Sequence, residues 1–342
     1  MPNSHHVTEF AGLPVVEFPA VDTEEGGSAY TEDPPQSPEA LAAAVAGPGS
    51  VAWRLRVSSV YPAEDFRDYF ARFLAAVDTG RIRALIVGGW GDFEEEPPST
   101  VPRDALIADA DAFPELRALF FGEILQEEYE ISWIHQSDLA PLVAAFPLLE
   151  ELTVRGTGDP YLGDGKLEMA LAEHTGLRTL VLQTGGLPGQ VAREVAASPL
   201  PSLENLELWL GVEGYRGDTT PDDLARVLSG EAFPELRYLG LRNAEDVDGW
   251  IPVLAQAPVL ASLDVLDLSL GILTDKGGRA LIDSASAFAG LRRLDLHHHY
   301  MSEDVRARLR AALPGVEVDL SEPREPYTRG GGEPYYYTAV AE

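Results

Sequence analysis

The chain has 342 residues, of which 45% are hydrophobic, so it can bury an elongated core. Its net charge of -31 disfavours binding to nucleic acid or to an anionic membrane, and favours a protein or peptide partner that carries a basic patch. The absence of cysteine excludes disulfides and thiolate chemistry. No stretch has the length of a membrane span or the pattern of a secretory signal, so we expect a cytoplasmic protein.

Residues 1–50 differ in composition from the rest of the chain. They hold eight acidic residues and no Lys or Arg, and Pro, Gly and Ser are frequent from residue 24 to residue 38. The apolar sequence of residues 7–18, interrupted by turn-forming residues, predicts a β-hairpin. Because the first layer of a repeat array needs a cover, we interpret residues 1–50 as a cap hairpin and an acidic loop. A separate interaction arm is the alternative.

A motif of the form L-x-x-L-x-L, with Ile, Val or Phe as variants, recurs at intervals of 26 to 34 residues. Its eight copies begin at Ile82, Leu116, Leu149, Leu177, Leu203, Leu236, Leu263 and Leu291. A weaker copy precedes them at 52–57, and a closing strand follows at 316–320. Apolar residues at helical spacing between the copies predict helices, for example over 66–77, 275–288 and 302–313. Strand, loop and helix in repetition predict an α/β solenoid, a horseshoe with its parallel sheet on the concave face and its helices on the convex face.

The segments FPELRALFFG, FPELRYLGLRN, LDVLDLSLG and LRRLDLHHHYMSEDVRARLRAAL resemble leucine-rich repeats of the long, ribonuclease-inhibitor-like class. As a whole, the chain also resembles a family of uncharacterised bacterial leucine-rich-repeat proteins. The resemblance covers an array of about nine units over residues 51–321, followed by a tail at 322–342, and it implies protein binding through the concave sheet. The Asn or Cys that this class carries eight positions after the first Leu is replaced here by Trp90, Ile124, Thr157, Gly185, Gly211, Ala244, Gly271 and His299. We therefore expect irregular loops after the strands.

The third, fifth and seventh residues of each motif should line the concave face, because strand side chains alternate between the two faces. Near the second and third units these residues are apolar, with Ala84, Ile86, Ala118 and Phe120. Later units carry charged and aromatic residues, and insertions after several strands place Tyr161 and Tyr215 in neighbouring loops. The candidate binding residues are Arg155, Glu207, Trp209, Tyr215, Tyr238, Arg242, Asp267, Arg293, Asp295 and His297. We expect the aromatic residues to supply affinity and the charged ones to orient the partner.

Two other parts of the chain could compete for this face. The apolar patch is either open to a partner or covered by residues 1–50 or by the tail, because a monomer seldom exposes such a patch. The tail from Tyr327 to Glu342 could also occupy the groove, or extend a sheet edge, as a ligand supplied by the chain itself.

An enzymatic function is the alternative to a binding scaffold. His297, Asp267 and Asp295 together could form a divalent metal site, although Arg242 and Arg293 should pair with the two carboxylates. The sequence contains no phosphate-binding loop, nucleophile elbow or zinc-protease motif. We therefore predict a non-enzymatic protein-binding scaffold without a cofactor.

Overall fold

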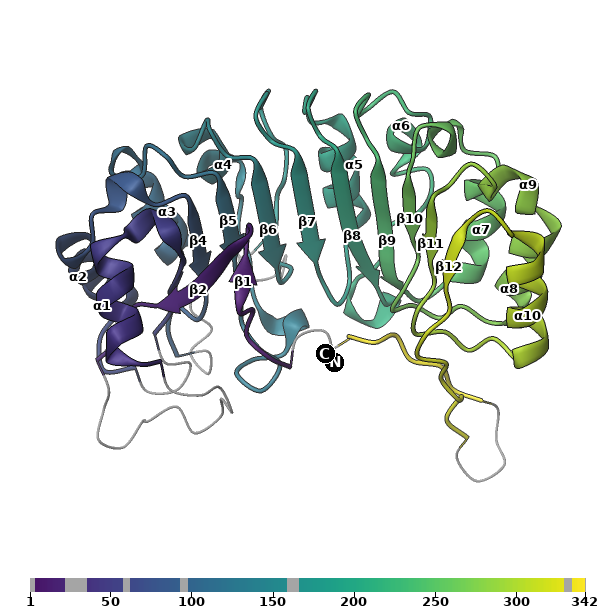
Figure 1. Cartoon of the computed structure of the whole chain (residues 1–342), viewed down its shortest axis with the longest axis horizontal. Coiled ribbons are helices and arrows are strands. Elements are labelled where there is room, and N and C mark those ends of the chain that lie inside the picture. The colour runs from purple at the N-terminus through teal and green to yellow at the C-terminus, as the bar shows by residue number, and fades with distance from the viewer. Residues whose placement is uncertain are drawn as a thin grey trace. The chain divides into compact units, whose positions relative to one another are not determined.

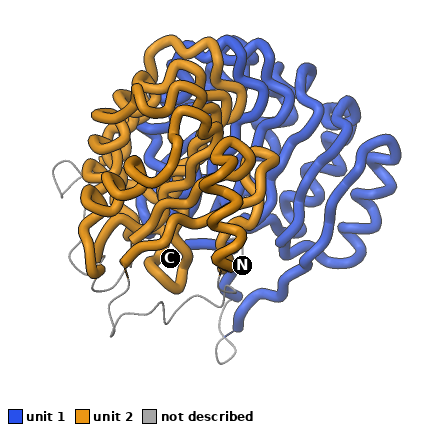
Figure 2. The backbone as a smooth tube through the Cα atoms, turned by 60° about the vertical axis from the view of Figure 1, so that its left-hand side comes forward, with its two compact units in different colours: residues 1, 180–341 blue, residues 2–179, 342 orange. Residues whose placement is uncertain are grey.

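The computed structural model describes residues 4–21, 36–57, 62–92, 98–158, 166–328 and 334–341. Most of the Pro-, Gly- and Ser-rich stretch before residue 38, Tyr161 and the Gly-Gly-Gly at 330–332 lie outside these residues. The chain forms two compact units, Pro2–Thr179 and Leu180–Ala341, which we call the N-terminal unit and the C-terminal unit (Figure 2).

The N-terminal unit opens with the expected hairpin, whose strands β1 and β2 are joined by a two-residue turn at Ala11 and Gly12. Both turn residues have positive φ, at 50° and 70°, as a tight hairpin turn requires. Strand β2 then pairs in parallel with β3, and β3 to β6 pair in sequence order. The elements of this unit are β1 (Glu9–Phe10), β2 (Leu13–Glu17), α1 (Pro38–Ala46), η1 (Pro48–Ser50), β3 (Ala52–Leu55), α2 (Phe66–Ala76), η2 (Thr79–Arg81), β4 (Ala84–Val87), α3 (Thr100–Ala108), η4 (Ala110–Ala112), β5 (Ala118–Phe121), η5 (Ile131–Trp133), α4 (Ala140–Ala145) and β6 (Glu151–Arg155).

The C-terminal unit repeats the same alternation of strand and helix. Its strands β8 to β12 pair in parallel and in sequence order, and its helices lie on one side of them (Figure 1). The predicted helix over 275–288 is divided at Ser284 into two helices. The elements are β7 (Thr179–Gln183), α5 (Gly189–Ala197), β8 (Asn205–Gly211), η6 (Glu213–Tyr215), α6 (Ala225–Leu228), β9 (Tyr238–Ala244), α7 (Val247–Leu254), η7 (Pro258–Ala261), β10 (Val265–Asp267), α8 (Asp275–Asp283), α9 (Ala285–Phe288), β11 (Arg293–Asp295), α10 (Glu303–Ala312) and β12 (Glu317–Asp319).

The recurring spacing of the motif within the chain is explained by burial. The fourth residue of every copy is completely buried between sheet and helices: Leu85, Leu119, Leu152, Leu180, Leu206, Leu239, Leu266 and Leu294 each expose 0% of their surface. Helix α2 shows how a helix meets this layer, since Phe66, Phe70 and Phe73 form one buried face and the Asp65 carboxylate caps the first turn by accepting from the Asp68 amide. The α/β solenoid predicted from the repeats is confirmed.

The strand register aligns the columns that the sequence predicted on the other face of the sheet, which we call the open sheet face. In the C-terminal unit, the third-position residues Tyr238, Val265, Arg293 and Glu317 stand side by side. The fifth-position residues Glu207, Gly240, Asp267, Asp295 and Asp319 form the next row. Within the described residues, no helix combines the length and hydropathy needed to cross a membrane.

Candidate binding surface

The apolar patch of the N-terminal unit is covered by the chain itself. Phe10 of the hairpin packs on Ala84, Ile86, Ala118 and Phe120, and its ring centroid lies 6.0 Å from that of Phe120. Phe120 is 4% exposed, and the other three patch residues expose 2% or less. The expectation that residues 1–50 cover the patch is confirmed for the hairpin, and these apolar residues are not a bare surface.

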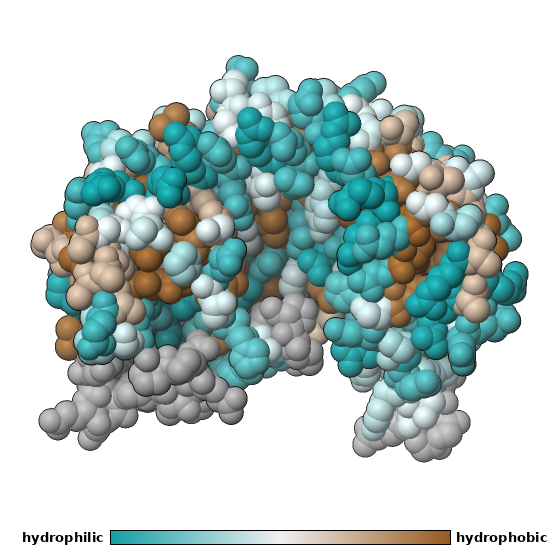
Figure 3. Space-filling model, in the orientation of Figure 1, coloured by the Kyte–Doolittle hydropathy of each residue, from teal (hydrophilic) through white to brown (hydrophobic). Residues whose placement is uncertain are grey.

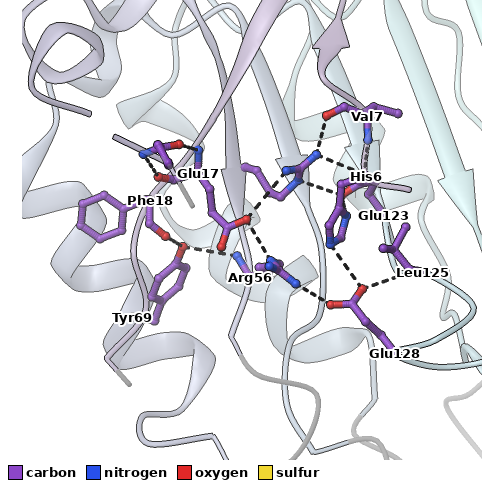
Figure 4. Close-up of polar contacts among 11 residues, drawn as sticks. His6, Val7, Glu17, Phe18, Arg56, Tyr69, Glu123, Leu125 and Glu128 are labelled. Atoms are coloured by element: carbon purple, nitrogen blue, oxygen red, sulfur yellow. Dashed lines mark hydrogen bonds and ion pairs between the residues drawn. The ribbon is translucent and has the colours of Figure 1, made fainter. Parts of the chain in front are cut away.

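A buried charged network fastens the start of the chain to the same unit (Figure 4). Glu123, fully buried in the loop after β5, accepts from His6 Nδ1 at 2.9 Å, from the Val7 amide at 2.8 Å and from Arg54 Nε at 2.9 Å. Burial by itself would raise the pKa of Glu123, but the hydrogen bond from His6 and the charge of Arg54 outweigh it and hold the pKa below its usual value. The carboxylate is therefore charged, and it joins the N-terminal segment to β3.

Two further carboxylates, those of Glu17 and Glu128, extend this network beside the hairpin. Arg56 donates to Glu17 of β2 at 2.9 Å and to Glu128 at 2.5 Å, and Glu128 also accepts from the Leu125 amide at 2.9 Å (Figure 4). Burial opposes the charge of Glu128, yet His6 and Arg56 lower its pKa. Glu128 is therefore an internal ion-pair partner, although it belongs to an acidic stretch of the sequence.

Arg155 is an internal residue rather than a partner contact. It is 4% exposed, its Nη1 donates to the carbonyl of Ile124 at 2.8 Å, and its guanidinium lies 5.2 Å from the centre of the Phe120 ring. Burial lowers its pKa to about 10. The prediction that Arg155 orients a partner is corrected here, because the neighbouring loop and the Phe120 ring enclose the side chain.

In the C-terminal unit, four candidate residues form one hydrogen-bonded cluster on β8, β9 and β10. The Tyr238 hydroxyl lies 2.9 Å from both Glu207 Oε2 and Asp267 Oδ2. Arg242 donates to Glu207 at 2.8 Å and lies 3.3 Å from Asp267 Oδ2. Burial, followed by the charges of the two carboxylates, raises the pKa of Tyr238, so its hydroxyl keeps its proton. The cluster is neutralised only in part, because two carboxylates share one guanidinium.

Trp209 also belongs to this cluster, and its side chain is buried rather than exposed to a partner. It is 2% exposed, its Nε1 donates to Glu207 Oε1 at 2.7 Å, and the Arg242 guanidinium lies 5.6 Å from the centre of its ring. The prediction that Trp209 supplies binding affinity as an exposed side chain is therefore wrong. The seventh position does face the open sheet face, but the Arg242 guanidinium of the neighbouring strand lies over the indole.

Arg293 organises a second cluster at the end of the sheet. It donates to Asp295 at 2.8 Å, to Asp319 at 2.7 Å and to Glu317 at 2.8 Å. Sequence analysis named Arg293 and Asp295 but missed Glu317 and Asp319. Both occupy the third and fifth positions of the closing strand, so the rule that selected the other candidates would have found them there.

The aspartates of this row share a second contact. Asp267, Asp295 and Asp319 each accept from the backbone amide two residues later, at 2.9, 3.1 and 3.0 Å. Such a side chain bends the backbone at the end of its strand and satisfies an amide that the ladder leaves unpaired. The loops after β10, β11 and β12 are therefore fixed by these aspartates rather than by the Asn ladder of the repeat class.

The proposed metal ligands are engaged in other contacts. His297 Nδ1 is 2.7 Å from Asp295 Oδ1, and the other oxygen of Asp295 faces Arg293. Among the described residues, no group of three or more His, Asp or Glu side chains has the geometry to hold a metal ion. His297 is followed by two more histidines, His298 and His299. His299 is fully buried, and its Nδ1 accepts from the Met301 amide at 3.1 Å. His299 thus accepts from a backbone amide of the loop, at the motif position where the repeat class carries Asn or Cys.

Tyr215 lies apart from the two clusters. It ends the short 3-10 helix η6 in the loop after β8 and is half-buried. Its expected contribution to affinity remains a prediction.

We expect His297 to lose its proton at a higher pH than His298. The hydrogen bond to Asp295 raises the pKa of His297 above its ordinary value of 6.5, whereas burial lowers that of His298. The sign follows from linkage: the His297–Asp295 pair stabilises the fold fully below pH 6.5, and this contribution is lost as the pH rises through the folded-state pKa. NMR titration of the imidazoles measures the order directly.

The matched variants are Asp295→Asn, which should lower the pKa of His297, and Asp319→Asn, which removes a nearby carboxylate that does not contact the imidazole. If His297 titrates at or below the pH of His298, the assigned pairing does not exist in solution.

The chain was compared with family models, curated proteins and solved structures. No family model and no curated protein matches the sequence. A solved structure of a protein from Bacteroides fragilis is 30% identical, with a TM-score of 0.68, over 77% of this chain and 71% of that one. An internalin from Listeria monocytogenes is 14% identical with a TM-score of 0.37 over 80% and 69% of the two chains. A leucine-rich-repeat protein from Leptospira interrogans is 13% identical with a TM-score of 0.21 over 82% and 98%.

The repeated strand, loop and helix with a buried Leu at each fourth position define a leucine-rich-repeat protein. The chain belongs to the leucine-rich-repeat proteins, and within them to the same family as the Bacteroides fragilis protein.

Proposed function

We propose that this chain is a non-enzymatic scaffold that binds a basic segment of a protein or peptide on the open sheet face of β8 to β12. The observation that carries the proposal is the charge of that face. Five carboxylates, from Glu207, Asp267, Asp295, Glu317 and Asp319, face two guanidiniums, from Arg242 and Arg293, and the imidazole of His297. The excess of negative charge attracts Lys or Arg side chains.

The exposed end of this surface lies at β11 and β12. The side chains of Glu317, Arg293 and Asp319 are 59%, 32% and 28% exposed, whereas that of Asp267 is 8% exposed. A partner therefore meets Arg293 and its three carboxylates on β11 and β12 first. The more buried cluster around Tyr238 on β8 to β10 supports the sheet beside them. Hydrophilic residues dominate the surface seen in Figure 3, with apolar residues exposed in smaller groups between them. Such a surface is suited to charge-steered binding more than to a large apolar contact.

The test compares two double variants that remove the same charge from different places. Glu317→Gln with Asp319→Asn neutralises the exposed end of the face, and we expect it to weaken partner capture about tenfold because two charge contacts are lost. Glu303→Gln with Asp304→Asn neutralises the exposed start of α10 and should leave capture unchanged. Proteins retained by the immobilised chain from a cell lysate are quantified by mass spectrometry at low and high salt.

A partner that is lost from the β12 variant, retained by the α10 variant and released by salt supports the proposed surface. Equal capture by both variants would show that binding depends on net charge or on another surface, and the proposal would fail. Melting curves of both variants establish that each is folded.

A further inference from the structure

The end of β9 and the loops after β10 and β11 present a row of backbone groups at one edge of the C-terminal unit. Asn243, Leu270 and His298 occupy the same position in successive repeats and have positive φ, at 55°, 67° and 59°. Each donates its amide to the following loop, to the carbonyls of Ser269, His297 and Ser321. The left-handed conformation at each position changes the direction of the chain near the end of a strand, and the carbonyl of Leu270 faces away from the ladder.

The C-terminal segment of the chain lies along this row. The Tyr337 amide donates to the Tyr300 hydroxyl at 3.0 Å, and that hydroxyl donates to the Tyr337 carbonyl at 2.8 Å. Two residues later, the Ala339 amide donates to the Leu270 carbonyl at 2.7 Å. The ring of Tyr336 meets that of Tyr300 edge to face at 5.0 Å. The segment thus runs from the loop after β11 back towards the end of β9.

Asn243 contacts Val340 of this segment with both atoms of its side-chain amide. Its Nδ2 donates to the Val340 carbonyl at 2.5 Å, and its Oδ1 accepts from the Val340 amide at 3.0 Å. Asn243 is completely buried and Val340 is 4% exposed. A side-chain amide that takes both backbone groups of one residue recognises an extended peptide whatever its sequence, while the enclosed Val340 side chain adds a preference for a small branched residue.

We propose that the end of β9 and the loops after β10 and β11 form a binding site for an extended peptide, and that Tyr336–Val340 occupy it as a tethered ligand. The free ligand is a segment of another protein with a small branched residue at the position of Val340, small residues beside it and an aromatic ring at the position of Tyr336. The tether raises the local concentration of the internal segment, so a competing peptide must be abundant or bind more tightly to displace it. This site does not depend on the open sheet face, and the two proposals can fail separately.

The test uses the full chain with Val340→Asp, which places a charge in the enclosed position and should release the internal segment. The probe is a fluorescent synthetic peptide with the sequence of residues 333–342, EPYYYTAVAE. We expect the peptide to bind this variant about tenfold more tightly than the wild-type chain, whose site is already filled. Adding Asn243→Ala to the variant should remove the binding.

Two peptides provide matched controls. Replacing the exposed Tyr335 by alanine in the probe should leave its binding unchanged, since that side chain is 61% exposed, whereas a probe with Val340→Asp should not bind. Hydrogen exchange adds a readout on the unlabelled full chain: the amides of Ala339 and Val340 should be protected in the wild type and exposed in Asn243→Ala.

The proposal is overturned by a folded Val340→Asp chain that does not bind the probe, or by a wild-type chain that binds it equally well. It is also overturned by unprotected Ala339 and Val340 amides in the wild type. A wild-type dimer that Val340→Asp dissociates would place the segment of a second copy in the site, and would contradict its occupation by the chain's own tail.

Discussion

Trp209→Ala is expected to lower the free energy of unfolding of the C-terminal unit by about 3–5 kcal/mol. The indole is 2% exposed, so truncation leaves a cavity that packed neighbours fill only in part. It also removes the donor to Glu207 and the ring beneath the Arg242 guanidinium. Urea unfolding followed by circular dichroism measures the loss. A decrease in partner capture by this variant would then reflect unfolding, not the loss of a direct contact.

Two tryptophan variants separate burial from residue type. Trp209→Phe keeps an aromatic ring and most of the buried volume but loses the hydrogen bond to Glu207, so about 1–2 kcal/mol should be lost. Trp133→Ala removes a side chain that is 47% exposed and should change stability by less than about 0.5 kcal/mol. If Trp209→Ala is no more destabilising than Trp133→Ala, the indole is not enclosed in solution.

The fold could be predicted because its periodicity is set by packing. Each unit must place a Leu such as Leu206 or Leu239 in the layer between sheet and helix, and no polar residue is tolerated there. The alternation of strand side chains then fixes which residues share the open sheet face, and the register of β9 to β11 confirms those columns. The weaker copy predicted at 52–57 is out of register by two residues, because Trp53 and not Leu55 pairs with Leu85.

The exposed fraction of each side chain on that face could not be predicted. Its position in the motif indicates the face to which it points, but not which neighbouring groups cover it. Trp209 and Arg155 both stand in the expected column, yet both are buried. Arg242 lies over the Trp209 ring, and the loop at Ile124 and the Phe120 ring contact Arg155. The network around Glu123 was also missed. Its contact to His6 joins residues that are 117 positions apart, and nothing in the local sequence of either indicates the other.

Glu123→Ala is expected to destabilise the N-terminal unit by about 3–5 kcal/mol, because removing one partner of a buried ion pair leaves the others buried and uncompensated. His6 and Arg54 are 4% and 7% exposed, and both lose a carboxylate contact of 2.9 Å. The Val7 amide loses its acceptor as well. We therefore expect the hairpin to detach before the repeats unfold. Hydrogen exchange at the Val7 and Phe10 amides, together with urea unfolding, follows the two events.

Glu127→Ala is the matched control, since it removes an exposed glutamate from the same loop and should cost less than about 0.5 kcal/mol. Glu123→Gln keeps an acceptor oxygen and nearly the same volume but removes the charge. Its loss should fall between those of the two alanine variants, because hydrogen bonds to a charged group are stronger than those to a neutral one. Equal stability of Glu123→Ala and Glu127→Ala would show that the hairpin is held by the Phe10 contacts alone, with the charged network contributing nothing to its attachment.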